Sequence, residues 1–481
     1  MNKPLQNTCH RLGRAGRLCR FAAGLAAAGF GFGPALVADT LYWNGGDGTW
    51  MAGTGTAGWS DTAESGAGSL GWIDNNDAVF TSANPTLTIG SAASDKVYVG
   101  NLTIQNGLTL KQAANAVDFY ITGAGSGNLT LQATAIQLRT FLQSSSAWNG
   151  TISVSGSASN SNYVYVDSAS AVGSSTRLNV DLGYVLFGAS SGSASFTIGE
   201  LSGADSNSLI RSRGDSVQTL RIEQNTDTTY AGRIGSATTG TWNLNLIKAG
   251  TGTLVLSGDV SHAGTTLVES GKLYFNGTTS ARNTLNGVSV ASGATLGGKG
   301  LIGIGGGATR NVTIADGGIL APGGVDEIGT LTINGNSTAG ALVTSAGLVF
   351  TKNATIQVRL AELGTNDKIV LTGNGTNFGK GSAAGGDGSI LFDFTNDNGL
   401  AELGTYDLIT FANEPGIVLS TFGLTQASID AGWAGTFGYS GNILQFTVTG
   451  IGTVIPESST YAAIIGGLAL AGVICVRRRR T

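Results

Sequence analysis

Three nine-residue segments of this chain share one pattern and align without gaps. Each segment has apolar residues at positions one, three and nine and glycine at position six. The segments are Leu102–Leu110 (LTIQNGLTL), Val288–Leu296 (VSVASGATL) and Val312–Leu320 (VTIADGGIL). Positions one and three lie on the same face of a strand. Asn, Ser or Asp followed by Gly forms a tight turn, because Gly accepts a positive φ. The pattern predicts a short buried strand, a turn and the start of another buried strand.

Repetition of this unit favours an all-β fold built as a right-handed parallel β-helix, which is a solenoid. The second copy begins at Val288 and the third at Val312, and this spacing suits one coil of such a repeat. A β-sandwich would also alternate apolar and polar residues, but it would not require aligned nonapeptides with a fixed glycine. Gly supplies 77 of the 481 residues, more than twice the usual share of about 7%. We therefore assign residues 86–340 to β-helix repeats.

The nonapeptides make this expectation specific to named residues. Their apolar positions should be buried in stacked parallel strands, and their glycines should lie at turns. The apolar residues are Leu102, Ile104, Val288, Val290, Leu296, Val312, Ile314 and Leu320, and the glycines are Gly107, Gly293 and Gly317.

Aromatic residues mark the regions on either side of the repeats. Residues 39–85 contain Trp43, Trp50, Trp59, Trp72 and Phe80. An open solenoid end exposes a strand edge that recruits other chains, so we interpret this region as an N-terminal cap. A surface on which sugars stack is the alternative. Residues 341–450 contain two longer strand-like segments, YDLITF and ILQFTV, and are interpreted as a C-terminal β region.

One segment within the repeats has a family likeness. Leu246–Gly277 reads LIKAGTGTLVLSGDVSHAGTTLVESGKLYFNG and resembles the autotransporter-associated β-strand repeat. The match lies in Lys248, Gly250, Gly252, Leu254, Leu256, Ser257, Gly258, Gly264, Gly271, Leu273 and Gly277. His262 stands where an aromatic residue is more usual in that repeat. The resemblance implies a β-helix like that of autotransporter passenger domains.

The N-terminus has the three parts of a secretory signal peptide. A basic stretch with five cations ends at Arg20, the uncharged stretch FAAGLAAAGFGFG follows it, and PALVADT comes next. We expect residues 1–38 to be the signal peptide, removed by signal peptidase after Ala38.

The C-terminal residues 454–481 combine three features in a fixed order. Pro456 and Glu457 precede Thr460–Val476, which contains no charge, and Arg477, Arg478, Arg479 and Arg480 follow. Seventeen apolar residues lie at the lower limit for a transmembrane helix, and the arginines favour a cytoplasmic C-terminus. We expect a transmembrane helix at 460–476, with the arginines as its cytoplasmic stop.

This order resembles the PEP-CTERM sorting tail. The usual motif of that family is Pro-Glu-Pro, whereas here Ser458 occupies the third position of the sorting motif. The resemblance implies processing by exosortase, a membrane peptidase of Gram-negative bacteria that produce exopolysaccharide and biofilm.

The sequence offers little for catalysis, metal binding or cofactor binding. Cys9, Cys19 and Cys475 all lie in the terminal segments, and His262 is the one histidine between those segments. The acidic residues are scattered. Asp74 with Asp77 and Asp393 with Asp397 come closest to pairs, and turn roles account for all four. We expect no catalytic, cofactor-binding or metal-binding residues.

Two short motifs give even weaker evidence of a binding function. Gly385-Gly386-Asp387-Gly388 is one copy of a calcium-binding turn that needs many copies. Arg213-Gly214-Asp215 matches an integrin-binding tripeptide, which chance explains in a chain of this composition. Between the basic ends, 17 basic residues stand against 30 acidic ones, so nucleic acid is not an expected partner.

These features together predict an exported cell-surface or extracellular-matrix protein with a structural or adhesive role. Its expected partners are signal peptidase, an exosortase-like peptidase, the membrane through the C-terminal helix, and exopolysaccharide. The alternative is a β-helix enzyme, a lyase or hydrolase that acts on polysaccharide. Three or more ionisable side chains that converge in a groove would favour the enzyme.

Overall fold

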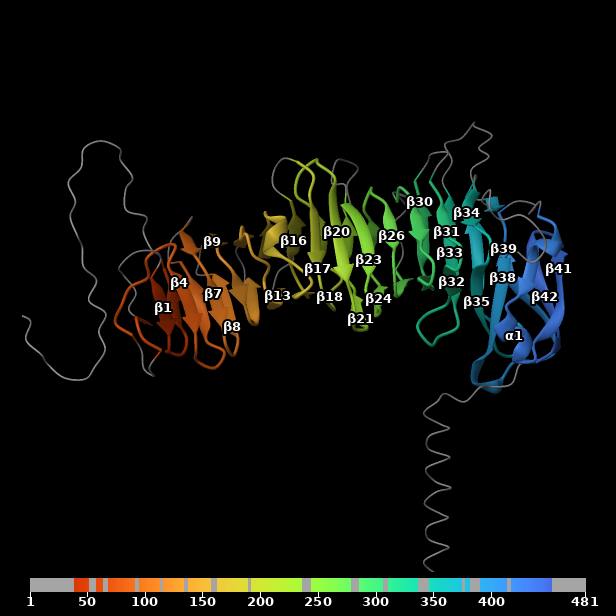
Figure 1. Ribbon diagram of the computed structural model, residues 1–481, viewed down its shortest axis with the longest axis horizontal. Coiled ribbons are helices and arrows are strands. Elements are labelled where there is room, and N and C mark those ends of the chain that lie inside the picture. The colour runs from red at the N-terminus through yellow and green to blue at the C-terminus, as the bar shows by residue number, and fades with distance from the viewer. Residues whose placement is uncertain are drawn as a thin grey trace, which may run out of the picture. The chain divides into compact units, whose positions relative to one another are not determined.

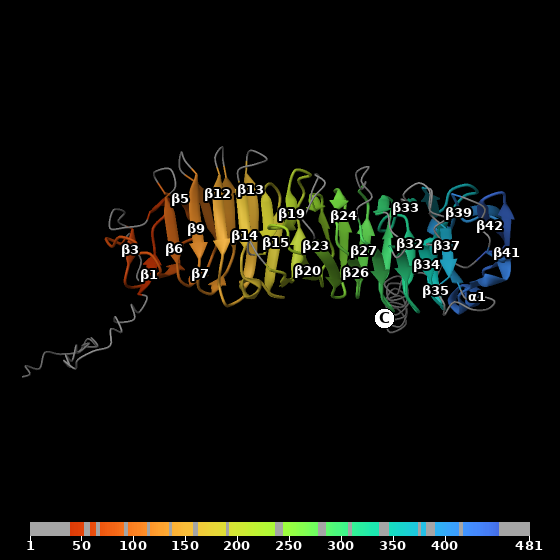
Figure 2. The same ribbon diagram turned by 90° about the horizontal axis from the view of Figure 1, so that it is seen from above.

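A computed structural model describes residues 39–451 apart from short gaps. The gaps are 52–57, 64–67, 91–94, 113–115, 134–136, 157–161, 189–191, 236–243, 278–284, 306–309, 336–345, 374–376, 381–389 and 413–416. The strands of this part follow one another in chain order, from red to blue in Figure 1, and Figure 2 shows the same succession from above. This arrangement is a solenoid of short strands joined by turns.

Three sheets form the first part of the solenoid. The five-stranded sheet has the order β10 (Gly125–Ser126), β7 (Leu102–Ile104), β4 (Asp77–Phe80), β1 (Thr40–Trp43), β3 (Trp59–Ser60). The seven-stranded sheet has the order β18 (Glu200–Ser202), β15 (Thr176–Val180), β13 (Gly150–Gly156), β11 (Leu129–Ala133), β8 (Leu108–Gln112), β5 (Thr86–Ile89), β2 (Gly48–Trp50). The first eight-stranded sheet has the order β25 (Val260–Ser261), β22 (Arg233–Gly235), β19 (Leu209–Ser212), β16 (Tyr184–Phe187), β14 (Asn162–Val166), β12 (Leu138–Leu142), β9 (Val117–Ile121), β6 (Lys96–Val99).

Three further sheets form the second part. The second eight-stranded sheet has the order β17 (Ser195–Ile198), β20 (Gln218–Glu223), β23 (Leu244–Ala249), β26 (Thr266–Val268), β28 (Val288–Val290), β31 (Val312–Ile314), β34 (Ala346–Phe350), β37 (Asn377–Lys380). The third has the order β21 (Thr228–Tyr230), β24 (Thr253–Leu256), β27 (Lys272–Phe275), β29 (Thr295–Gly298), β32 (Ile319–Pro322), β35 (Ala354–Leu360), β38 (Ile390–Asn396), β40 (Phe422–Leu424). The six-stranded sheet has the order β30 (Leu301–Ile304), β33 (Thr330–Gly335), β36 (Lys368–Thr372), β39 (Gly404–Thr410), β42 (Ile443–Gly450), β41 (Ala434–Ser440).

Helices are short in the part of the chain that the structure describes. They are one α-helix, α1 (Gln426–Asp430), and three 3₁₀ turns, at Ala169–Ala171, Asp397–Gly399 and Leu419–Thr421. None of the described helices is long and apolar enough to cross a membrane. The predicted span 460–476 lies outside the described residues.

Parallel pairing between successive coils confirms the predicted β-solenoid. The nonapeptide strands pair in register, with Val288 opposite Val312 in β28 and β31, and Leu296 opposite Leu320 in β29 and β32. All eight apolar positions that the nonapeptides single out are buried. The three turn glycines have positive φ, 126° at Gly107, 74° at Gly293 and 70° at Gly317. Because apolar residues face inward at every other strand position, they form one continuous core along the coils.

The first coil carries a buried tryptophan cluster. Trp50, Trp59 and Trp72 are completely buried, and Trp43 is 4% exposed. The ring centroids of Trp50 and Trp59 lie 4.9 Å apart, and those of Trp59 and Trp72 lie 4.7 Å apart. Strand β3 pairs antiparallel with β1 beside this cluster. The indoles are therefore core side chains, and none of the four presents an open surface to a sugar.

The last described strands change from parallel to antiparallel pairing. β42 pairs antiparallel with both β39 and β41. Phe394, Phe437 and Phe446 pack beside them, with the centroids of Phe437 and Phe446 4.8 Å apart. Thr425 caps the N-terminus of α1, and its side chain accepts a hydrogen bond from the Ser428 backbone amide. The parallel ladder thus ends in a small antiparallel sheet with an aromatic core.

Candidate binding surfaces

A row of aromatic side chains runs along the outer face of four neighbouring strands, β6, β9, β12 and β14. Figure 2 shows these strands close together. In-register pairing places Tyr98 beside Tyr120, Tyr120 beside Phe141, and Phe141 beside Tyr165. Successive ring centroids are 4.4, 4.5 and 4.7 Å apart, with planes within 11° of parallel. These spacings match the distance between neighbouring strands, about 4.8 Å. We call these four residues the aromatic ladder.

Two more tyrosines stand beside the ladder in a second row. Tyr163 lies parallel to Tyr165, with 6.1 Å between the ring centroids. Tyr184, on the next strand, meets Tyr163 edge-on at 5.1 Å and 90°. Phe141 is 9% exposed, whereas the five tyrosines are half-buried. The ring faces within the ladder are therefore covered by one another, and the Tyr120 hydroxyl donates to Asp118 Oδ2 at 3.3 Å.

Arginine–aspartate pairs border these aromatic rows. Arg139 Nε contacts Asp118 Oδ1 at 2.5 Å, and the side chains are 35% and 7% exposed. Arg213 pairs with Asp167, and here the exposed fractions are 30% and 16%. In both pairs the carboxylate lies beneath and the guanidinium lies toward solvent.

One of these arginines lies over the ladder near Tyr165. The guanidinium carbon of Arg213 lies 4.5 Å from the centroid of Tyr165 and 5.8 Å from that of Phe141. A cation at this distance is attracted by the negative face of the ring. The guanidinium therefore lies along the outer side of two neighbouring rings, while the residue opposite Tyr165 on the next strand is Leu186.

The phenols of this surface are held in their neutral form. Burial, with Asp118 as a second cause, raises the pKa of Tyr120 to about 12. Burial also raises the pKa values of Tyr163 and Tyr165, while nearby arginines act in the opposite direction. Neutral phenols can donate hydrogen bonds, so near neutral pH this surface combines O–H with guanidinium N–H donors, of which the Tyr120 O–H is bonded to Asp118.

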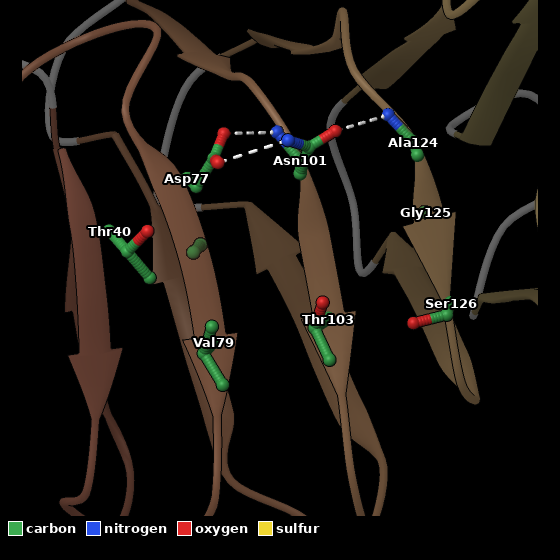
Figure 3. A pocket seen from close by; sticks show the side chains of 9 residues that line it. Thr40, Asp77, Val79, Asn101, Thr103, Ala124, Gly125 and Ser126 are labelled. Carbon is green, nitrogen blue, oxygen red and sulfur yellow. Dashed lines mark hydrogen bonds between the residues drawn. The ribbon is translucent and has the colours of Figure 1, made fainter. Parts of the chain in front are cut away.

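A polar groove lies on the five-stranded sheet. It has a volume of about 460 Å³ and is lined by Thr40, Val79, Thr103 and Ser126, whose short side chains follow the strands in Figure 3. Asp77 accepts hydrogen bonds from the backbone N and the Nδ2 of Asn101, at 2.7 and 3.0 Å. Asn101 in turn accepts a bond from the Ala124 amide at 2.7 Å. The Asp77 carboxylate is thus part of a series of hydrogen bonds that join the turns of successive coils.

A smaller cleft brings together ionisable residues that the sequence did not link. Asp326, Arg359 and Asp367 line it, together with Tyr274, around about 170 Å³. Asp367 accepts bonds from Arg359 Nε at 3.0 Å and from the Gly329 amide at 2.9 Å. Burial raises the pKa of Asp367, and Arg359 opposes this effect. The pair ties the loop after β32 to β35.

The other candidate residues from the sequence do not form such a group. Asp74 accepts a bond from the Tyr98 amide at 3.1 Å, which is a turn contact. Asp393 accepts bonds from the hydroxyls of Thr425 and Ser428, both at 3.0 Å, whereas Asp397 bonds to Asn398 at 3.2 Å. Among the residues that the structure describes, no three His, Cys, Asp or Glu side chains are grouped to hold a metal ion.

The remaining sequence predictions fall on the termini or on one loop. Ala38, Pro456, Glu457, Ser458 and Arg477–Arg480 lie outside the described residues, as does the glycine-rich segment 385–388. The arginine of the Arg213-Gly214-Asp215 tripeptide is the residue that lies over Tyr165 and Phe141 of the aromatic ladder.

The aromatic ladder is the feature that sequence reasoning missed. Its members stand in the short strands KVYV, VDFYI, LRTFL and NYVYV, one strand from each of four successive coils. Each ring is an outward residue between two buried ones, which is not by itself unusual. The recurrence of an aromatic residue at the outward position of four successive coils is the signal that could have identified the row.

The repeat-like segment has a specific buried contact that explains its first residues. Lys248 is completely buried, and its Nζ donates to the carbonyl oxygens of Ala249, Gly250 and Ser270 at 2.8, 3.3 and 3.3 Å. Burial lowers the pKa of this ammonium to about 8, and Asp227 opposes the effect. The lysine therefore joins the turn after β23 to the turn before β27 in the next coil.

His262 lies in the same segment and is also completely buried. Its Nε2 lies 3.1 Å from the Thr266 hydroxyl. Burial lowers the pKa of His262 to about 4, and hydrogen bonds with the backbone of Leu244 and Gly264 act in the opposite direction. This histidine is a neutral core side chain.

Comparison with known proteins identifies this segment and leaves the rest of the chain unassigned. Residues 246–274 match the family described as the passenger-associated transport repeat. No curated protein matches the chain. The matched residues include Lys248, His262 and the two turns that Lys248 joins. This part of the solenoid is therefore similar to the β-repeats associated with autotransporter passenger domains.

Proposed function

We propose that this chain is an exported, non-enzymatic protein of the cell surface or extracellular matrix, with a structural or adhesive role. The observation that carries the proposal is the passenger-associated transport repeat at 246–274, seated within a parallel β-solenoid. The features at the two ends of the sequence are compatible with this role. The proposed route is export by the N-terminal signal peptide and sorting by an exosortase-like peptidase that acts on the C-terminal tail.

The sorting proposal rests on the order of features in residues 454–481. A helix of about 17 residues is short for a permanent anchor, so its proposed role is to present Pro456 and Glu457 to a membrane peptidase. Arg477–Arg480 would hold the extreme C-terminus in the cytoplasm. In this account the membrane-spanning stage is transient, and the solenoid faces outward from the inner membrane.

Fractionation of two tail variants tests this route. Replacement of Pro456 and Glu457 with Ala should leave full-length protein in the inner membrane, because the peptidase has lost its motif. Replacement of Arg477–Arg480 with Gln should let more protein pass through unprocessed, because the cytoplasmic stop is gone. If both variants distribute and migrate like the parent, the tail is not a sorting signal.

A polysaccharide-active enzyme is the second candidate function, and one specific observation favours it. The cleft at Asp326, Arg359 and Asp367 holds three charged groups, and burial raises the pKa of one of its carboxyls, as a general acid requires. Against catalysis, Asp367 already accepts bonds from Arg359 and the Gly329 amide. These bonds give the carboxylate a role in holding the loop.

An activity assay separates the two candidates. The full chain is incubated with neutral and uronate-containing polysaccharides, and reducing ends and unsaturated uronate products are measured. The non-enzymatic proposal predicts no product with the parent. Product that disappears in Asp326→Asn and Asp367→Asn variants that remain folded would assign the cleft as an active site.

A further inference from the structure

The outer face of β6, β9, β12 and β14 differs from the groove on the five-stranded sheet, where short polar side chains prevail. From this difference we propose that the aromatic ladder and its bordering arginines bind an anionic, hydroxyl-rich polysaccharide that lies along the solenoid axis. The inference rests on the proposed surface role and names the class of matrix polymer that the surface would meet.

The orientation of the rings indicates what they can contact. In the ladder, the faces between successive rings are covered at 4.4–4.7 Å, so the half-buried tyrosines contact solvent mainly along their ring edges. The Tyr120 hydroxyl already donates to Asp118 at 3.3 Å. An aromatic edge carries partial positive charge, and a neutral phenol donates a hydrogen bond. Such a row favours a ligand that is rich in oxygen acceptors over an apolar ligand.

The charged groups act in the same direction. In three pairs the arginine is more exposed than its aspartate, 35% against 7% for Arg139, 30% against 16% for Arg213, and 40% against 20% for Arg233. Each guanidinium has five N–H donors, and pairing with one carboxylate leaves others to donate outward. The outward groups of these pairs, including Arg233 on β22 of the same sheet, are therefore cations, each balanced by the aspartate beneath it. They stand on a solenoid in which 17 basic residues oppose 30 acidic ones between the two ends of the chain.

The same geometry favours a polysaccharide over a single-stranded nucleic acid. Proteins that bind single strands offer open aromatic faces on which bases stack. In this ladder the faces between successive rings are occupied by neighbouring rings, and Arg213 lies against Tyr165 and Phe141. A uronate polymer needs no such platform, because its carboxylates and hydroxyls bind N–H and O–H donors directly.

Binding of the full chain, held in mild detergent, to immobilised polygalacturonate tests the proposal, with dextran as the neutral polymer. The parent should bind polygalacturonate, and this binding should weaken as the salt concentration rises. The parent should bind dextran at least tenfold more weakly. Tyr98→Phe, Tyr120→Phe and Tyr165→Phe in one chain keep the stack and remove its hydroxyls. This triple variant and Arg213→Gln should each raise Kd at least about tenfold, the effect of losing hydrogen bonds to a charged group.

Arg177→Gln is the matched control, since this arginine is 62% exposed on the seven-stranded sheet and its loss should change Kd less than twofold. Thermal unfolding verifies that every variant is folded. The proposal is overturned if the parent does not bind polygalacturonate, if dextran or single-stranded DNA binds as tightly, or if folded ladder variants bind like the parent. None of these results depends on the tail, so a failure of binding is distinct from a failure of export or sorting.

Discussion

Substitution of Gly271 tests how tightly successive coils approach one another. Gly271 has a φ of 66°, and a Cβ there would lie 2.4 Å from the Gly250 oxygen, 2.6 Å from the Gly252 oxygen and 2.8 Å from Lys248 Nζ. Gly293 is a natural control, because its φ is 74° and nothing lies within 4 Å of its added Cβ. Alanine therefore meets the same backbone conformation at both positions but meets a neighbouring coil only at position 271.

The free-energy cost of the left-handed backbone can be separated from the cost of contact with the neighbouring coil. A left-handed conformation costs a non-glycine residue about 1–2 kcal/mol, which is the full expected effect of Gly293→Ala. Gly271→Ala adds the displacement of two carbonyl groups and of Lys248, and overpacking of this kind costs about 1–3 kcal/mol more. We expect the two variants to differ by about 2 kcal/mol, or roughly 30-fold in an equilibrium constant.

Native-state hydrogen exchange is the suitable assay, because a solenoid opens locally. The reporter is the Thr295 amide, which donates to the Gly271 oxygen at 2.9 Å. Gly271→Ala should reduce its protection about 30-fold more than Gly293→Ala does. Equal losses in the two variants would refute the close approach of the coils at this turn.

Three further predictions concern stability. Leu296→Ala removes a buried side chain between Leu273 and Leu320 and should lower the free energy of unfolding by about 3 kcal/mol, measured by urea titration. The control Thr313→Ala, on the outer face, should change that free energy by less than about 0.5 kcal/mol. The pKa of His262 is about 4 in the fold against 6.5 normally, so the stability that comes from its neutral form is present above pH 6.5 and is lost as the pH falls toward 4. His262→Phe should remove that part of the pH dependence of the unfolding midpoint. An unchanged pH profile would contradict the assignment of His262 as a neutral core side chain. EDTA and reductant should each leave the melting temperature of the purified ectodomain unchanged, because all three cysteines lie in the terminal segments, and a marked fall with EDTA would reveal an ion site.

The sequence predicted those parts of the fold that local patterns determine. Alternating apolar residues and a following glycine define a strand and its turn within one nonapeptide, so the burial of Val288, Leu296 and Val312 could be expected. The spacing between the second and third copies, which equals one coil, also indicated which coils are neighbours, and Val288 does pair with Val312.

The candidate binding surface depends on contacts that no local pattern contains. Arg213 and Asp167 are separated by 46 residues, and each rung of the ladder comes from a different coil. Because the loops between strands differ in length, the register of one coil on the next is needed before the outward aromatics align. The burial of the tryptophans also could not be predicted from a local pattern, since it depends on the pairing of β3 with β1.

In-register stacking of parallel coils is the central structural claim, and cysteine cross-linking tests it most directly. In a chain whose three native cysteines are replaced by Ser, Ser289→Cys and Thr313→Cys occupy opposed positions of β28 and β31. Neighbouring strands are about 4.8 Å apart, which a disulfide can span. Ser289→Cys with Ala315→Cys is the control, because a two-residue offset separates the Cα atoms by about 8 Å. Mild oxidation should form an intramolecular disulfide rapidly in the first pair and slowly or not at all in the second. Equal rates in the two pairs, or faster closure of the offset pair, would contradict the solenoid register.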